Sequence, residues 1–121
     1  MFLGLRTAIY PVGDLAKAKA WYEKAVGVKP YFDEPYYVGF TVGGFELGLL
    51  PDGTPGTAGP QPLWGVKDIE GEFKRLISLG ATEIEPVKGV GGRIKVAAVK
   101  DPFGNRLGLI DNPHFNSKDV R

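Results

Sequence analysis

Residues 12–30 read VGDLAKAKAWYEKAVGVKP, and residues 66–84 read VKDIEGEFKRLISLGATEI. Each stretch begins with Val-x-Asp, continues through an apolar residue and a helical segment, and then reaches a glycine. Further along the chain, GGFELGLLP at 43–51 is echoed by FGNRLGLID at 103–111. A repeated unit predicts two similar substructures that face each other. The seam between such halves is a natural place for a pocket.

The first copy contains clear signals for one helix and one hairpin. Asp14 is placed to cap the helix, because its carboxylate can accept hydrogen bonds from free amides of the first turn. Apolar residues then recur at helical spacing, and Gly27 supplies the left-handed residue with which helices commonly end. The pair Gly43-Gly44 is typical of a two-residue hairpin turn. The strands expected in this copy are residues 3–12, 28–33, 36–42 and 45–50.

The second copy repeats this order. Asp68 is the expected cap of a helix that Gly80 ends. Asp101-Pro-Phe-Gly predicts a type I turn, because the aspartate bonds back to the backbone and proline fixes φ at the next position. The strands expected in this copy are residues 62–67, 81–87, 93–100 and 105–111. Each copy therefore has the predicted order β-α-β-β-β.

Composition places the chain among ordinary globular proteins. The 121 residues suit one domain, and we expect module one at 3–50, a linker at 51–61, module two at 62–112 and a tail at 113–121. A formal charge of +1 gives no general attraction to nucleic acid or to an anionic membrane surface. The chain has no cysteine, which excludes thiol chemistry and disulfides. No apolar run is long enough for a membrane span, and we expect a cytoplasmic protein.

These motifs together resemble the vicinal oxygen chelate superfamily, which includes glyoxalase I, extradiol dioxygenases and bleomycin-resistance proteins. The likeness covers residues 3–112 and rests on Val12-Gly13-Asp14-Leu15, Trp21-Tyr22, Gly27, Val66-Lys67-Asp68-Ile69, Gly80-Ala81-Thr82, Asp101-Pro-Phe-Gly-Asn105, Leu107 and Leu109. The resemblance implies an α+β fold of two βαβββ modules that form a curved, cup-shaped mixed sheet. It also implies helices on the convex face, a ligand in the concave face and a homodimer.

Enzymes of this superfamily hold a divalent metal on the concave face with His, Glu or Gln side chains. The resemblance places the corresponding positions seven residues before each capping aspartate, three residues after Asn105, and at the repeat equivalent of that last position. These positions are Thr7, Gln61, Gly108 and Gly48. A transition metal needs imidazole, carboxylate or thiolate donors, which glycine and threonine do not supply. The only histidine, His114, lies in the tail. We therefore expect no metal and no other cofactor.

Strand alternation from these positions predicts which side chains face the concave cup. The opposite phase is more uniformly apolar, as expected for residues packed under the helices. Apolar walls with a few polar groups are typical of small-molecule sites. The candidate ligand-binding residues are Thr7, Ile9, Glu46, Gly48, Gln61, Leu63, Arg106 and Gly108.

Several residues have two or more readings from the sequence. The small size of Gly48 and Gly108 reflects either a close approach of neighbouring chain segments or space for an organic ligand. Glu46 and Arg106 occupy equivalent positions, and they either bind a zwitterion, form a salt bridge, or lie at a solvated rim. A cluster of aromatic residues forms either packing at a sheet edge or a stacking surface for a flat ligand. The cluster consists of Phe32, Tyr36, Tyr37 and Phe40.

Three functions are compatible with these patterns. The favoured function is a metal-free protein that binds a small organic molecule, without assigned catalytic residues. The alternative is a lyase, isomerase or dioxygenase of the same superfamily, either with a metal or with Glu46 as general base. A structural role, in which side chains fill the cup, is the third.

Overall fold

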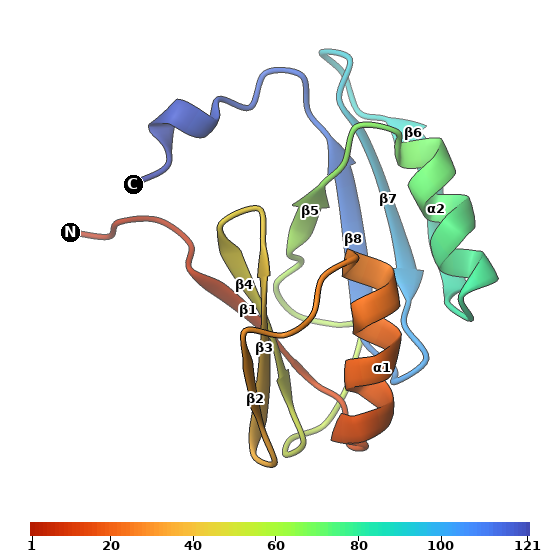
Figure 1. Cartoon of the computed structure of the whole chain (residues 1–121). Helices are drawn as coiled ribbons and strands as arrows, with labels where there is room; N and C mark the ends of the chain where they lie inside the picture. Colours follow the sequence, from red (N-terminus) through yellow and green to blue (C-terminus); the bar gives the residue numbers. More distant parts are fainter.

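The computed structural model describes residues 1–121 and contains the expected β-α-β-β-β order twice (Figure 1). The first module consists of β1 (Thr7–Pro11), α1 (Leu15–Val26), β2 (Phe32–Glu34), β3 (Tyr37–Val42) and β4 (Phe45–Leu50). The second consists of β5 (Leu63–Gly65), α2 (Ile69–Ser78), β6 (Thr82–Gly89), β7 (Lys95–Lys100) and β8 (Arg106–Asp111). A short 3-10 helix, η1 (Ser117–Asp119), follows in the C-terminal segment. Neither α1 nor α2 has the length and apolar character needed to cross a membrane.

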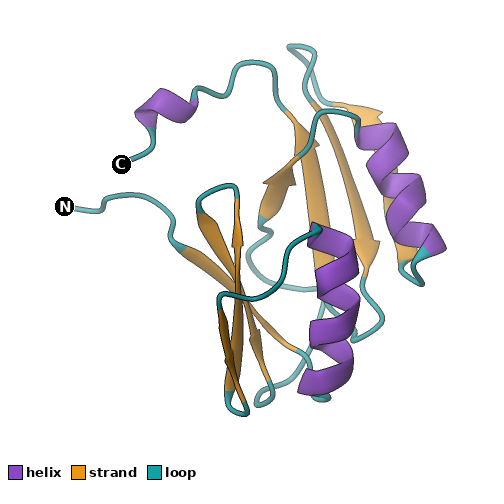
Figure 2. Ribbon diagram, in the orientation of Figure 1, coloured by secondary structure: helices purple, strands orange, loops and turns teal.

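The strands form two four-stranded mixed sheets, one in each module, instead of one continuous sheet. Their orders are β1-β4-β3-β2 and β5-β8-β7-β6. In each sheet the first strand of the module pairs in parallel with the last, and the remaining pairs are antiparallel. Both helices lie on the same side of their sheets, and the two chain termini lie on the other side (Figure 2). Because β1 and β5 come first in the two strand orders, each is an edge strand of its sheet.

The predicted caps and turns are confirmed. The side chain of Asp14 accepts a hydrogen bond from the Lys17 amide at 3.1 Å, and Asp68 does the same for Gly71 at 3.1 Å. Gly27 ends α1 with φ at 78°, in the left-handed region where a side chain is disfavoured. These signals act within one turn of the helix that each of them bounds.

Burial follows the alternation predicted from the sequence. In β1, Ala8 and Tyr10 are buried against the helices, whereas Ile9 is 50% exposed on the opposite face. In β8, the Leu107 and Leu109 side chains are buried in the same core. The helix-covered faces of both sheets contribute to one core of 17 buried residues. The faces that carry no helix, called the open faces below, bear the candidate ligand-binding residues.

The Asp-Pro-Phe-Gly-Asn turn joins the two modules through buried hydrogen bonds. Asp101 is 2% exposed and accepts from the Tyr22 hydroxyl of α1 at 2.5 Å. Its other oxygen accepts from the amides of Phe103 and Asn105, each at 2.9 Å. The Asn105 side chain donates to the Pro11 carbonyl at 2.7 Å and accepts from the Gly56 amide at 3.2 Å. The motif therefore fastens its own turn, α1, the end of β1 and the linker together.

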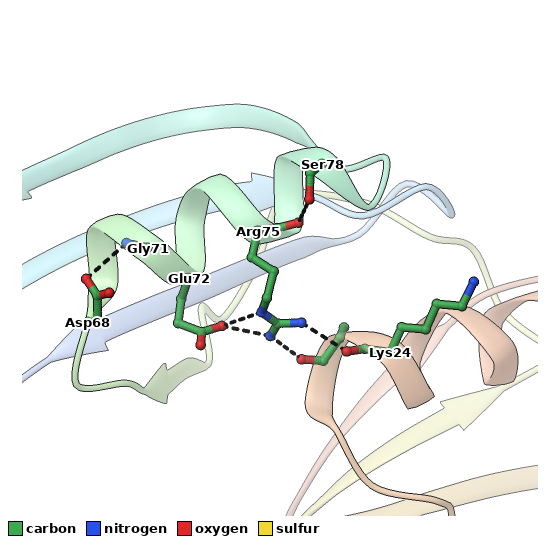
Figure 3. A network of polar contacts seen from close by, with 7 residues as sticks. Lys24, Asp68, Gly71, Glu72, Arg75 and Ser78 are labelled. Atoms are coloured by element: carbon green, nitrogen blue, oxygen red, sulfur yellow. Dashed lines mark hydrogen bonds and ion pairs between the residues drawn. The ribbon is translucent and has the colours of Figure 1, made fainter.

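A second contact between the modules lies at the helix ends. Arg75 of α2 donates to the carbonyls of Lys24 and Ala25 in the last turn of α1, at 3.0 and 2.6 Å (Figure 3). Glu72 holds the same guanidinium at 2.7 Å. A cation at a helix C-terminus satisfies unpaired carbonyls and interacts favourably with the helix dipole. Arg75 therefore fixes the mutual position of the two helices.

Candidate functional site

A cleft of about 600 Å³ lies beside edge strand β1. One wall is formed by Leu5 and by β1 itself, and the other is formed by parts of residues 54–62 together with Asn105 and Arg106. Apart from the candidate residue Gln61, residues 51–61 were predicted only to connect the modules, yet this segment supplies much of the cleft surface. The candidate residues that line the cleft are Thr7, Ile9, Gln61 and Arg106. Those that do not are Glu46, Gly48, Leu63 and Gly108.

The cleft exists because β1 is paired on one side only. The even-numbered residues from Arg6 to Val12 direct their backbone groups toward β4. The Val12 amide, for example, donates to the Leu50 carbonyl. In a parallel ladder, the intervening residues direct their amides and carbonyls away from the partner strand. The side-chain amide of Asn105 uses one of these groups, the Pro11 carbonyl. The backbone amide and carbonyl groups of Thr7 and Ile9 also point away from β4, toward the cleft.

Glu46 is the centre of a hydrogen-bond network on the open face of the first sheet. Its Oε1 accepts from the hydroxyls of Thr7 at 2.7 Å and Tyr37 at 2.6 Å. Its Oε2 accepts from the hydroxyl of Tyr31. Thr7 and Glu46 are direct partners in the β1–β4 ladder. Tyr31 immediately precedes β2, and Tyr37 is the first residue of β3. The spacing in the sequence does not predict these phenols beside Glu46, because only the tertiary structure brings them to it.

These hydrogen bonds set the charge state of the network. Burial raises the pKa of Glu46, but the hydroxyls of Thr7, Tyr31 and Tyr37 lower it, and the net pKa lies below its ordinary value. Burial and the bond to Glu46 raise the pKa of Tyr37 to about 12. The carboxylate therefore remains charged and the phenol remains neutral at neutral pH. A group with a lowered pKa is a weak general base, so the network is poorly suited to proton abstraction.

The space next to Gly48 and Gly108 is already filled. A Cβ atom on Gly48 would collide with the Tyr37 hydroxyl. A Cβ atom on Gly108 would lie 2.5 Å from Leu63 Cδ2 and 2.7 Å from the Pro62 carbonyl oxygen. Close approach of neighbouring groups therefore explains both glycines. The alternative, that their missing side chains leave room for a ligand, is wrong at these two positions.

Arg106 has a different partner from the one considered in the sequence analysis. Its Nη2 lies 3.1 Å from Glu85 Oε1, and no ion pair joins it to Glu46. The Arg106 side chain is 14% exposed, and its buried Nε has no hydrogen-bond partner. The guanidinium also holds the pKa of Glu85 below its usual value. Register shifts on both sides of Glu85 in β6 place this carboxylate, which strand alternation alone does not predict.

The aromatic cluster differs from the predicted one in one member. Phe40 is fully buried in the core, because strand alternation turns it toward α1. Phe32 lies 6.0 Å from Tyr36 and 6.1 Å from Tyr37 between ring centroids, and Tyr31 joins them from the other side at 6.5 Å. The remaining cluster flanks the Glu46 network and supports its tyrosines.

The residues at the four superfamily metal positions do not fit a transition metal. Two are glycines, and the Thr7 hydroxyl is committed to Glu46 as a donor. Gln61 is the only one with a free oxygen ligand. The chain contains no group of three or more His, Cys, Asp or Glu residues arranged to hold a metal ion. His114 instead contacts the Gly92 carbonyl oxygen at 2.7 Å.

Comparison with known proteins supports the resemblance. The model of the Glyoxalase/Bleomycin resistance protein/Dioxygenase superfamily matches residues 4–109. A glyoxalase-related enzyme from Fulvimarina pelagi superposes with a TM-score of 0.78 at 18% identity, covering 99% of this chain and 96% of that one. The TM-score is 0.72 for a glyoxalase/bleomycin resistance protein from Albidiferax ferrireducens T118, at 18% identity and 90% and 98% coverage. It is 0.73 for a lactoylglutathione lyase from Agrobacterium tumefaciens, at 16% identity and 93% and 97% coverage. At these identities the structures show the common fold alone, and no curated protein sequence matches the chain.

Proposed function

Because this chain belongs to the Glyoxalase/Bleomycin resistance protein/Dioxygenase superfamily, we propose that it binds a small organic molecule in the cleft beside β1 without a metal. The observation that carries this proposal is the set of side chains at the superfamily metal positions. The superfamily metal positions hold two glycines, a committed threonine and one glutamine, while Thr7, Ile9, Gln61 and Arg106 still line a cleft. A volume of about 600 Å³ lies within the range of small-molecule sites.

The Glu46 network takes over the organising role that a metal has in the related enzymes. A metal ion would hold side chains from several strands together on the open face. Here a carboxylate on β4 is bonded to β1 through Thr7 and to β3 through Tyr37, and the Tyr37 hydroxyl covers Gly48. Hydroxyl donors satisfy the charge of Glu46, so the face needs no cation to be stable.

Catalysis is the alternative function, as a lyase, isomerase or dioxygenase. The structure offers Tyr31 and Tyr37 as proton donors beside Glu46, which favours a metal-free acid–base reaction over a metal-dependent one. The lowered pKa of Glu46 and the raised pKa of Tyr37 oppose it, because neither group titrates near neutral pH. Binding therefore accounts for the site better than catalysis.

A homodimer is part of the proposal. Leu63, on the unpaired edge strand β5, is 42% exposed and Leu3 is 62% exposed, and neither residue lines the cleft. A second copy of the chain that covers these residues would remove apolar surface from water. The absence of cysteine, and hence of disulfides, is consistent with the proposed location in the cytoplasm, where disulfides are rare.

A thermal-shift screen tests the binding proposal. The wild-type protein, treated with EDTA and dialysed, is heated with a broad set of small organic molecules. We expect at least one chemical class to raise the melting temperature in a concentration-dependent way, because a ligand that binds only the folded state stabilises it. Failure of every class to do so, with and without added Zn²⁺, Mn²⁺, Ni²⁺ and Fe²⁺, would contradict binding.

A further inference from the structure

We infer that the ligand of the cleft is an amphipathic monoanion, with a carboxylate held by Arg106 and an apolar portion held against Leu5 and Ile9. This inference rests on the proposed binding function and specifies the chemical class of the ligand. It follows from the charge of the lining, the unmet hydrogen-bond capacity of Arg106 and the apolar surface of the opposite wall.

The charge of the cleft has one source. Among the residues that line it, Arg106 is the only charged one, and there is no aspartate or glutamate. Glu46 lies outside the lining, and its oxygens are occupied by three hydroxyl donors. Arg106 is paired with Glu85, but Glu85 does not line the cleft, so the only charged side chain in the lining is a cation, which favours an anion over an ammonium group. This arrangement argues against the zwitterionic ligand considered from the sequence.

The Arg106 guanidinium is incompletely paired. Its single ion-pair partner is Glu85, which it meets through Nη2 at 3.1 Å, and its unpaired Nε is buried, so a ligand would reach the guanidinium through its Nη atoms. A guanidinium presents a planar fork of N–H groups that matches both oxygens of a carboxylate. The side chain of Gln61, on the same wall of the cleft as Arg106, makes no hydrogen bond within the chain and can donate to the same anion.

The rest of the cleft suits a hydrocarbon group. The Leu5 and Ile9 side chains are more exposed than a core aliphatic residue would be, at 62% and 50%. Pro60 and Pro62 line the facing wall and have no amide N–H to offer. Burial of an aliphatic chain between these walls supplies affinity, and the guanidinium supplies orientation.

Three matched probes test the ligand class: hexanoate, hexanamide and hexylamine. They share an aliphatic chain and differ in charge, and their dissociation constants are measured by amide chemical-shift titration of the wild-type protein. We expect hexanoate to bind about tenfold or more tightly than hexanamide, because a hydrogen bond to a charged group contributes about 1.5–3 kcal/mol. We expect hexylamine to be the weakest probe, and the shifts caused by hexanoate to centre on Thr7, Ile9 and Gln61.

Variants that are expected to change hexanoate affinity in opposite directions test whether Arg106 holds the carboxylate. Arg106→Gln should abolish the preference for hexanoate over hexanamide, and Arg106→Lys should retain part of it because lysine keeps the charge without the fork. Glu85→Gln removes the competing carboxylate and should tighten hexanoate binding. Lys17→Gln on α1 removes the same formal charge outside the cleft and should leave the preference unchanged.

The outcomes separate this inference from the proposed function. Equal or tighter binding of hexanamide or hexylamine in the cleft would overturn the anionic ligand while leaving small-molecule binding intact. Unchanged hexanoate affinity in both Arg106→Gln and Glu85→Gln would overturn the role of Arg106. If no probe binds and the thermal-shift screen also finds no ligand, both proposals fail.

Discussion

Replacing Asp101 with alanine is expected to lower the free energy of unfolding by about 3–5 kcal/mol, because it leaves a hydroxyl and two amides buried without an acceptor. The three donors are the Tyr22 hydroxyl and the amides of Phe103 and Asn105. Tyr22 is fully buried, and burial followed by the nearby Asp101 raises its pKa well above the ordinary value. The phenol therefore stays protonated and donates under all ordinary conditions. Loss of the Asp101 side chain removes the hydrogen bonds that hold its own turn and the hydrogen bond to Tyr22 that joins the two modules.

Urea unfolding of a small variant series measures this effect. Tyr22→Phe should cost less, about 1.5–3 kcal/mol, because Asp101 keeps its two amide donors. Asp52→Ala, at an exposed aspartate of the linker, serves as the matched control and should change stability by less than about 0.5 kcal/mol. The Asp101→Ala and Tyr22→Phe effects should be non-additive in the double variant, because both remove the same hydrogen bond. An Asp101→Ala protein as stable as the control would contradict the proposed fastening role.

Gly108→Ala is expected to destabilise the protein by about 1–3 kcal/mol, the usual cost of overpacking. Its Cβ atom would lie 2.7 Å from the Pro62 carbonyl oxygen, and a backbone group cannot move without shifting β5. The three atoms nearest to a Cβ on Gly48 all belong to the Tyr37 side chain, which can rotate away. We therefore expect a smaller loss of stability there, accompanied by loss of the Tyr37–Glu46 hydrogen bond.

Gly65→Ala is the matched control for Gly108→Ala. Gly65 lies on β5, the strand that pairs with β8, and a Cβ atom there would meet nothing within 4 Å. We expect its stability to match the wild type within about 0.5 kcal/mol in the same urea titration. Equal stability of Gly108→Ala and Gly65→Ala would show that the segment around Pro62 is not held close to β8.

Local signals in the sequence predicted most of the fold. Asp14 and Asp68 identified both helix starts, because a capping carboxylate acts within one turn and needs no tertiary context. The register was also predictable: strand alternation turns Leu107 and Leu109 to the core once one face is known to be apolar. The division of the strands into two sheets was not, since it depends on which edges meet in space.

The site was predicted less completely, because its geometry depends on contacts between distant segments. Four of the eight candidate residues line the cleft. Glu46 does not, and its donors Tyr31 and Tyr37 could not be identified from spacing, since side-chain direction across three segments decides that contact. The pairing of Arg106 with Glu85 depends on irregular register in β6. Apart from Gln61, the proline- and glycine-rich linker carried no signal that it would form one wall of the cleft.

Elemental analysis of the untagged protein, purified without chelator from medium supplemented with zinc, iron, nickel and manganese, tests the central claim most directly. The residues on the open faces predict far less than one equivalent of any of these metals per chain, because two glycines, a committed threonine and one glutamine cannot coordinate such an ion tightly. One equivalent per chain that survives dialysis, and that is lost in Gln61→Ala or Glu46→Ala, would contradict a metal-free binding site.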